Sequence, residues 1–279
     1  MRRMTTTDIR AMKGNREKIP VVTAYDSPTA GLANAAGIPI ILVGDSLGMA
    51  VLGYDSTIPV TMDDMVHHTK AVARSAKHSF IVADMPFMTV QVDSSDALRN
   101  AARLVQDGGA QSVKLEGGER VAEQVRRIVE AGIPVMGHVG LTPQSVHQLG
   151  GYKVQGKIKE EVTRIFHDAQ VLEEAGAYAV VLELIPSSLA KVITKRLSIP
   201  TIGIGAGPYC DGQVQVLHDI LGLDIDFVPK HTKQYLRLNE LIVQALRLYA
   251  DEVRAGTFPT DKESFNMDED LLTDFDGPG

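Results

Sequence analysis

The feature that most restricts the fold of this sequence is a regular alternation of short apolar runs with longer helical patterns. Each run is almost continuously apolar, as in parallel strands that are covered on both faces. The eight runs are Ile19–Asp26, Pro39–Asp45, Phe80–Pro86, Ser112–Gly117, Pro134–Gly140, Ala179–Ile185, Pro200–Gly207 and Asp224–His231. Helical patterns lie near residues 27–36, 61–77, 94–107, 119–131, 158–175, 187–197, 211–221 and 233–254. This alternation predicts an α/β protein built as a (β/α)₈ barrel.

The junctions between the predicted elements favour the same fold. Ala36–Pro39 and Ala131–Pro134 each place a glycine at a helix end and an Ile-Pro pair before the next strand. An open, doubly wound sheet is the alternative. However, Gly203–Pro208 lacks the last glycine of the G-x-G-x-x-G dinucleotide fingerprint. Its glycines indicate either a ligand-facing loop after the seventh strand or tight packing.

Composition excludes several classes of protein. Among 279 residues, 28 are Lys or Arg and 35 are Asp or Glu, aromatic residues make up 5%, and Trp is absent. This balance disfavours a nucleic-acid-binding surface. No apolar run approaches the ~20 residues of a membrane span, and no apolar signal segment follows Arg2-Arg3. The single cysteine, Cys210, suits a reducing compartment, so we expect a cytoplasmic protein that binds neither nucleic acid nor membrane.

Negative charge is concentrated at the C-terminus. Residues 256–279 contain seven acidic residues and one basic residue, Lys262, which accounts for most of the formal net charge of −7. Such a segment is typical of a solvated, frayed end. We therefore predict one barrel domain over residues 1–265 and a flexible acidic tail over residues 266–279.

Polar side chains gather at the carboxyl ends of the predicted strands, where barrel enzymes carry their active sites. They are Asp26, Asp45 with Ser46, Asp84, Lys114 with Glu116, His138, Glu183, and Lys230 with His231. One acidic residue in such a place often caps the next helix, and Asp26, before Ser27-Pro28, fits that role. The convergence of several such strand ends on one barrel mouth predicts a functional site instead.

Three of these residues suit a magnesium ion. Asp45, Asp84 and Glu116 offer only hard oxygen ligands, which argues against a structural zinc site. Lys114 lies two residues from Glu116, so both side chains point to the same face of one strand. The lysine would then either pair with an acidic residue or bind a substrate carboxylate.

Two more residues have chemistry that the spacing leaves open. Glu183 lies within the apolar segment Val180–Ile185, a setting that suits a general base unless the carboxylate pairs with a basic partner. His138 lies between Gly137 and Gly140, where it is either a hydrogen-bonded core histidine or a residue that contacts a ligand.

A set of motifs, in order along the chain, resembles the ketopantoate hydroxymethyltransferase family. The motifs are Gly44–Met49, Leu52–Thr57, Ala83–Phe87, Val113–Gly117, Gly137–Ser145, Leu182-Glu183 and Ile202–Gly207. The resemblance extends from about Thr7 to Phe265, and the acidic end beyond it is not covered. It implies a (β/α)₈ barrel of the phosphoenolpyruvate/pyruvate superfamily type.

The resemblance also implies an activity. It is the transfer of a hydroxymethyl group from 5,10-methylenetetrahydrofolate to the 2-oxo acid 3-methyl-2-oxobutanoate, giving 2-dehydropantoate on the way to pantothenate. The implied assembly is a homo-oligomer, a decamer. By this resemblance Asp45 and Asp84 hold Mg²⁺ with Glu116 nearby, directly or through water, Ser46 and Lys114 bind the keto acid, Glu183 is the base, and His138 contacts the new hydroxyl group or the folate.

Two other functions compete with this prediction. A carbon–carbon lyase or phosphonomutase of the same superfamily, acting on a small 2-oxo acid, would share the metal carboxylates but would need a nucleophilic cysteine on a mobile loop. Cys210 has no activating cation next to it in the sequence, which favours a packing role. A non-catalytic sensor is the second alternative, and the combination of Asp45, Asp84, Lys114 and Glu183 argues against it.

Overall fold

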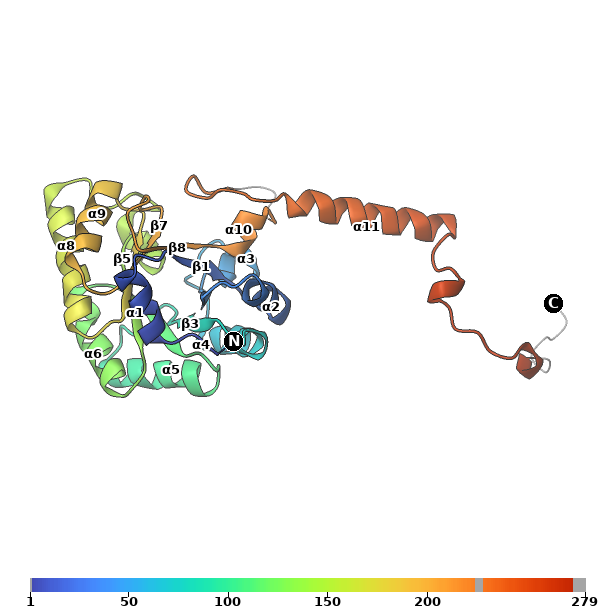
Figure 1. Ribbon diagram of the computed structural model, residues 1–279, viewed down its shortest axis with the longest axis horizontal. Helices are drawn as coiled ribbons and strands as arrows, with labels where there is room; N and C mark the ends of the chain where they lie inside the picture. Colours follow the sequence, from blue (N-terminus) through green and yellow to red (C-terminus); the bar gives the residue numbers. More distant parts are fainter. Residues whose placement is uncertain (1, 224–227, 273–279) are drawn as a thin grey trace.

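The computed structural model describes residues 2–223 and 228–272 and confirms the closed parallel barrel (Figure 1). The strands neighbour one another in sequence order, and the eighth pairs with the first. They are β1 (Ile19–Thr23), β2 (Ile40–Val43), β3 (Phe80–Asp84), β4 (Ser112–Glu116), β5 (Val135–Gly140), β6 (Ala179–Glu183), β7 (Thr201–Ile204) and β8 (Gly212–Gln215). The first seven lie within the predicted runs.

Six predicted helices form the outer layer. They are α2 (Ser27–Ala35), α4 (Met62–Ser75), α5 (Ser94–Gln106), α6 (Ala122–Glu130), α8 (Lys159–Glu174) and α9 (Ser187–Arg196). Asp26 caps α2 as predicted, because its side chain accepts a hydrogen bond from the Thr29 N–H at 2.7 Å. No helix in the described part of the chain is both long enough and apolar enough to cross a bilayer.

Short helices occupy the loops at the carboxyl ends of the strands and the C-terminal segment. They are α3 (Leu47–Ala50), η1 (Glu119–Val121), η2 (Pro143–Ser145), α7 (Val146–Leu149), η3 (Asp261–Glu263) and η4 (Glu269–Leu272). The two loops that carry α3, η2 and α7 border the barrel mouth described below.

A first helix, α1 (Thr6–Gly14), was not predicted. Thr5 and Asp8 form a capping box at its start, and this pattern can be recognised in the sequence. Ile9 and Met12 are buried in the same cluster as the barrel-interior residues Ile19 and Phe80, so α1 covers the amino end of the barrel.

The prediction was wrong at the eighth strand. Within the predicted strand 224–231, residues 224–227 lie outside the described residues, and the remaining four are not strand. The strand β8 lies instead within the segment predicted as a helix over 211–221, of which only α10 (Leu217–Leu221) is helical. Closure against β1 requires a glycine here, because a Cβ on Gly212 would lie 2.3 Å from the Ile19 carbonyl oxygen. Four residues with outward glutamines carry too weak an apolar signal to identify a strand.

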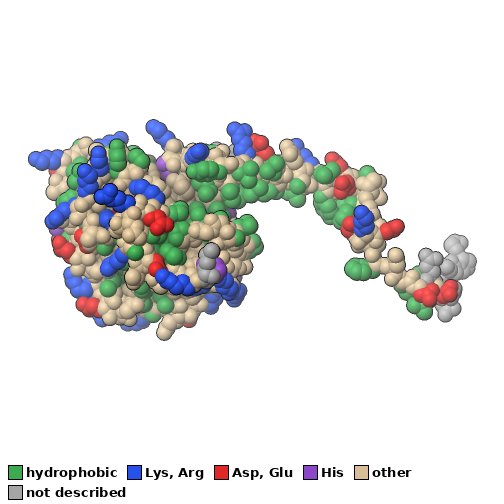
Figure 2. Space-filling view, viewed as in Figure 1, with side chains coloured by type: hydrophobic (Ala, Val, Ile, Leu, Met, Phe, Trp, Pro, Cys, Tyr) green, Lys and Arg blue, Asp and Glu red, His purple; other side chains and the backbone are tan. Residues whose placement is uncertain are grey.

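The long helix α11 (Leu238–Ala255) projects away from the barrel (Figure 1). None of its residues is buried. Apolar side chains run along it (Figure 2), and Leu241, Ile242, Leu248 and Tyr249 are between 41% and 61% exposed. The division of the chain at residue 265 stays a prediction.

Strand periodicity determines which side chains reach the barrel interior. Successive residues of a strand point to opposite faces, so residues two apart share a face. Phe80 and Val82 of β3 and Ala179 and Val181 of β6 belong to the interior cluster. The same register carries the last residue of β3 and of β6 onto the interior face at the carboxyl end. The barrel therefore presents a ring of strand-end side chains to one small mouth.

Candidate active site

The predicted site residues come together around one cavity of about 110 Å³ at the carboxyl end of the barrel. Those that line it are Asp45, Ser46, Asp84, Lys114, Glu116, His138 and Glu183. Lys230 and His231 are not part of it, because they line a separate cavity beside β7 and β8. Convergence of the strand ends is thus observed for seven of the predicted residues.

Lys114 is held by the carboxylate of Asp84. The Lys114 Nζ lies 3.0 Å from Asp84 Oδ1, and Asp84 Oδ2 accepts a hydrogen bond from the backbone N–H of Asp45 at 3.0 Å. Burial alone would lower the pKa of Lys114, but the carboxylates of Asp84, Glu116 and Asp45 raise it above its ordinary value. Lys114 is therefore a permanent buried cation in the mouth.

His138 connects Lys114 to Glu183. The His138 Nδ1 lies 3.3 Å from Lys114 Nζ, and the His138 Nε2 lies 3.2 Å from Glu183 Oε2. An ammonium group only donates hydrogen bonds, so Nδ1 accepts and the ring proton belongs on Nε2, facing Glu183. Burial, and then the charge of Lys114, lower the pKa of His138 and keep the ring neutral. A neutral imidazole in one tautomer thus lies with its Nε2 beside the carboxylate of Glu183.

Gln144 is a site residue whose role sequence analysis missed. Its backbone N–H donates to Glu116 Oε2 at 3.0 Å. Its side-chain Nε2 donates to Asp45 Oδ2 at 2.8 Å and to the Met85 carbonyl at 2.9 Å. One residue of the loop after β5 therefore ties two carboxylates from different strands together. Its only signal in the sequence was its place within the Gly137–Ser145 motif.

Tyr25 is a second residue that was not singled out. Its hydroxyl lies 2.8 Å from Ser46 Oγ, and the ring is 1% exposed. Burial raises the pKa of Tyr25, which keeps the phenol protonated. The Ser46 hydroxyl is therefore positioned by a neutral partner beneath the mouth.

The mouth holds more acidic groups than one lysine can balance. Four carboxylates, from Asp45, Asp84, Glu116 and Glu183, line the same cavity as Lys114. Burial and then the charge of Asp84 raise the pKa of Asp45 to about 7. Burial and then Asp45 raise the pKa of Glu116 well above its usual value. Added positive charge would relieve both effects, which is what a divalent cation supplies.

The carboxylates of the mouth suit Mg²⁺, which does not need a complete set of protein ligands. Within residues 2–223 and 228–272, no three His, Cys, Asp or Glu side chains are placed to hold a metal ion by themselves. Magnesium uses one or two carboxylates and completes its octahedron with water and substrate oxygens. Asp45 and Asp84, joined by the hydrogen bond above, could supply the carboxylates, with Glu116 beside them.

Cys210 and Gly207 do not line the mouth and are packed against other residues. Cys210 is 1% exposed, and burial raises the pKa of its thiol. At Gly207, with a φ of +78°, a Cβ would lie 2.4 Å from the Ser187 side chain. The structure therefore favours tight packing for Gly207 and an unreactive thiol for Cys210.

Comparison with known sequences gives one consistent result. Residues 3–261 match the model of a family described as ketopantoate hydroxymethyltransferase. A 3-methyl-2-oxobutanoate hydroxymethyltransferase of Dehalococcoides mccartyi is 59% identical over 270 residues, which cover 97% of each chain. One from Thermoanaerobacter sp. is 57% identical over 267 residues, 96% of this chain and 97% of the relative.

Solved structures with the same fold are more distant in sequence. A phosphonopyruvate hydrolase in complex with oxalate and Mg²⁺ superposes with a TM-score of 0.61 at 14% identity, covering 96% of this chain and 94% of that one. A 2,3-dimethylmalate lyase of the PEP mutase/isocitrate lyase superfamily gives 0.58 at 17% identity, covering 96% and 91%. At these identities the likeness shows the fold alone.

Proposed function

The chain belongs to the ketopantoate hydroxymethyltransferase family, and from this premise we propose how its barrel mouth works. The mouth transfers a hydroxymethyl group from 5,10-methylenetetrahydrofolate to 3-methyl-2-oxobutanoate and gives 2-dehydropantoate. The observation that carries the proposal is the ion-paired Asp84–Lys114 unit, linked through His138 to Glu183 in one cavity. The buried thiol and the family suit a cytoplasmic enzyme.

The keto acid would bind as an anion between a cation site and Lys114. We assign Mg²⁺ to Asp45 and Asp84, with Glu116 in contact directly or through water. Bound Mg²⁺ would supply Lewis-acid polarisation of the keto-acid carbonyl. Lys114 contributes a fixed positive charge for the substrate carboxylate, and the Ser46 hydroxyl donates a further hydrogen bond, so the substrate carbon C3 is directed at Glu183.

Glu183 acts as the base on C3. It accepts the C3 proton while His138 holds its carboxylate through Nε2. The bond from the methylene carbon to folate N10 opens, and the electron pair left on C3 forms the new carbon–carbon bond to that methylene carbon. One water molecule then gives its oxygen to the same carbon as the bond to N5 breaks. The proton taken from C3 and one proton of the water go to N5 and N10, so tetrahydrofolate leaves, and His138 is placed to hydrogen-bond the new hydroxyl.

The lyase alternative lacks its nucleophile. It needs a cysteine on a loop that reaches the mouth, whereas the single cysteine of the chain is buried behind β7, where its Sγ would lie 2.9 Å from a Cβ on Gly203. Turnover by the purified protein separates these activities. Product should form only with Mg²⁺, 3-methyl-2-oxobutanoate and methylenetetrahydrofolate together, as followed by NMR. Cleavage of a 2-oxo acid without folate, or no Mg²⁺-dependent turnover, would contradict the proposal.

We also propose that the chain works as a homo-oligomer in which α11 covers a neighbouring copy. On the barrel, Pro20 of β1 and Gln213 of β8 are register partners whose outward side chains are both exposed. A largely apolar cavity of about 1030 Å³ lies along this seam, where a helix after β8 would pack. Each copy thus offers an uncovered helix and an uncovered seam, which suits reciprocal exchange between two copies.

A charge placed on the apolar face of α11 should break this assembly. The resemblance implies ten copies, so we expect sedimentation to give the mass of a decamer. Ile242→Glu should reduce the mass, because Ile242 lies on the same helical face as Ala245 and Tyr249. Arg247→Glu, which introduces the same residue on the opposite face, is the control and should keep the wild-type mass. A monomeric wild type, or an Ile242→Glu variant of unchanged mass, would contradict the proposal.

A further inference from the structure

The mouth cavity is too small for the folate. A volume of about 110 Å³ suits a five-carbon keto acid but not a pteridine with an aminobenzoyl-glutamate tail. The folate must therefore lie outside the ring of strand-end residues while its methylene carbon reaches the keto acid. The question is which surface next to the mouth can hold it.

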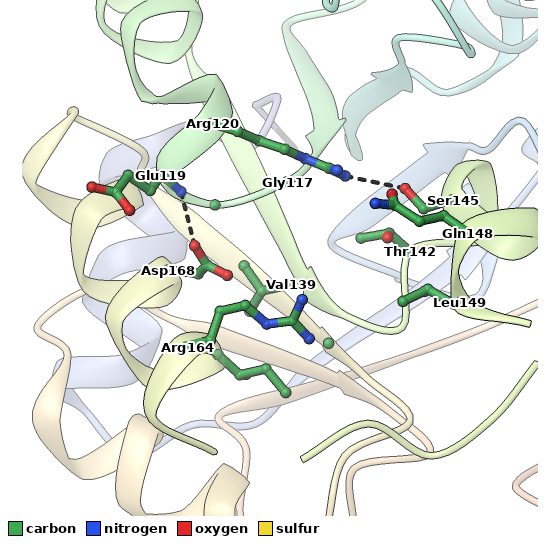
Figure 3. Close-up of a pocket in the computed structure, with 13 residues that line it drawn as sticks. Gly117, Glu119, Arg120, Val139, Thr142, Ser145, Gln148, Leu149, Arg164 and Asp168 are labelled. Atoms are coloured by element: carbon green, nitrogen blue, oxygen red, sulfur yellow. Dashed lines mark hydrogen bonds between the residues drawn. The ribbon is translucent and has the colours of Figure 1, made fainter. Parts of the chain in front are cut away.

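Two further cavities lie among the loops that follow β4 and β5, at the same end of the barrel as the mouth. The nearer one, which we call the amide pocket, has about 420 Å³ and is lined by Gln91, Gln124, Gln144, Gln148, Phe87 and Ile58, among others. The farther one, the arginine pocket, has about 460 Å³ and includes Arg120, Arg164, Thr142 and Asp168 (Figure 3). Arg120, Ser145 and Gln148 line both pockets. The two pockets are therefore contiguous, and together we call them the trench.

Gln144 joins the trench to the mouth. It lines the amide pocket, and its side chain donates to Asp45 Oδ2 at 2.8 Å. Its Oε1 is buried and has no hydrogen-bond partner among the residues that the structure describes. A buried acceptor of this kind calls for a donor, and a pteridine edge carries N–H groups.

The rest of the amide pocket has the chemistry of a heterocycle site. Glutamine amides supply both donors and acceptors, as the edge of a pteridine requires. Phe87 is 36% exposed and Ile58 lines the same cavity, so the pocket also offers apolar surface to a flat ring. Only Gln144 would separate a pteridine in this pocket from Asp45 of the mouth.

The arginine pocket suits the other end of a folate. Arg120 reaches across from the loop after β4 and donates to Ser145 Oγ at 3.1 Å, and Arg164 points into the same space from α8 (Figure 3). Two carboxylates, of Glu119 and Asp168, also line this pocket, and Asp168 Oδ1 accepts a hydrogen bond from the backbone N–H of Glu119 at 2.9 Å. Two guanidinium groups thus face a pocket into which a dicarboxylate could fit.

We propose that the amide pocket and the arginine pocket form the binding trench for the folate co-substrate, with Arg120 and Arg164 binding the carboxylates of its glutamate tail. This inference rests on the proposed function. It assigns the pteridine to the amide pocket and directs the tail outward along α8, so that the methylene carbon between them lies at the Gln144 end of the trench.

The test removes the two guanidinium charges and separately removes the glutamate tail of the ligand. Arg120→Gln and Arg164→Gln should each weaken tetrahydrofolate binding by about tenfold in titration calorimetry, as expected for a lost bond between charged groups. Tetrahydropteroate, which lacks the glutamate, should bind the wild type and both variants equally. Arg126→Gln, an exposed change on α6 outside the trench, is the matched control and should bind both probes as the wild type does.

The outcomes separate this inference from the proposed function. Unchanged tetrahydrofolate affinity in both variants, or an equal loss of tetrahydropteroate binding, would overturn the trench assignment. Exchange of the keto-acid C3 proton, which needs no folate, is measured on the same preparations. A parallel fall in exchange would show damage to the mouth and would also overturn the assignment. A wild type that neither exchanges this proton nor turns over would instead overturn the proposed function.

Discussion

Replacing Glu183 with glutamine should slow exchange of the keto-acid C3 proton with solvent deuterium by about 10²–10⁴-fold, the usual cost of losing a general base. Glutamine keeps the shape of the side chain and still offers an oxygen to His138 Nε2, which lies 3.2 Å from Glu183 Oε2. It cannot accept the proton. The measurement is NMR of the C3 proton in D₂O with enzyme, Mg²⁺ and 3-methyl-2-oxobutanoate, together with a titration of keto-acid binding, which should be unchanged.

Glu173→Gln is the matched control for this variant. Glu173 accepts a hydrogen bond from the Ser198 backbone at 2.7 Å, far from the mouth cavity, and its variant should exchange the proton at the wild-type rate. Wild-type exchange in Glu183→Gln would show that a residue other than Glu183 takes the C3 proton. Loss of keto-acid binding would make Glu183 a positioning residue rather than the base.

Asp84→Asn should weaken Mg²⁺ binding and keto-acid binding together, because the substrate is expected to dock partly through the cation. Changes to partners outside the ligand shell typically cost 10–100-fold in metal affinity, so we expect a loss of at least about that size for a ligand. Calorimetry of the keto acid with and without Mg²⁺ measures both effects. In the wild type the keto-acid affinity should depend on Mg²⁺, and in the variant this dependence should disappear.

The Asp84→Asn variant is expected to fold, and Asp26→Asn is its matched control for binding. Lys114 loses its partner at 3.0 Å but keeps the carboxylates of Glu116 and Asp45 nearby, so the lysine is not left without counter-charge. Asp26→Asn makes the same change in a residue that only caps α2, and it should bind metal and substrate normally. Keto-acid affinity that is independent of Mg²⁺ in the wild type would refute the assignment.

Seven strands could be predicted because parallel strands covered on both faces are the most continuously apolar segments of such a chain. The eighth could not, because β8 has four residues and its outward positions are glutamines, one of them exposed. Among the described residues of the chain no outer helix packs over that seam, so its outward positions tolerate polar side chains. The helix α1 was not predicted although its capping box is visible in the sequence, because it precedes the first apolar run and lies outside the alternation of strands and helices.

The partner of Lys114 is a contact between strands that the sequence could not predict. Glu116, two residues along the strand, shares its face, and pairing with an acidic residue was one of the two roles predicted for Lys114. In the barrel the closest carboxylate belongs to Asp84 on the adjacent strand, because parallel pairing places Asp84 opposite Lys114. The register of two neighbouring strands cannot be read from the residue spacing along one strand.

The sequence by itself determined the barrel, the strand ends that carry polar side chains, and the family, because strand periodicity and motif order are written in consecutive residues. Only the tertiary structure decided which of those side chains touch. Gln144 joins Asp45 and Glu116 across three strands, and His138 links Lys114 to Glu183. It also showed that α11 leaves its own barrel. Such contacts depend on barrel closure and strand register, which bring together residues far apart in the chain.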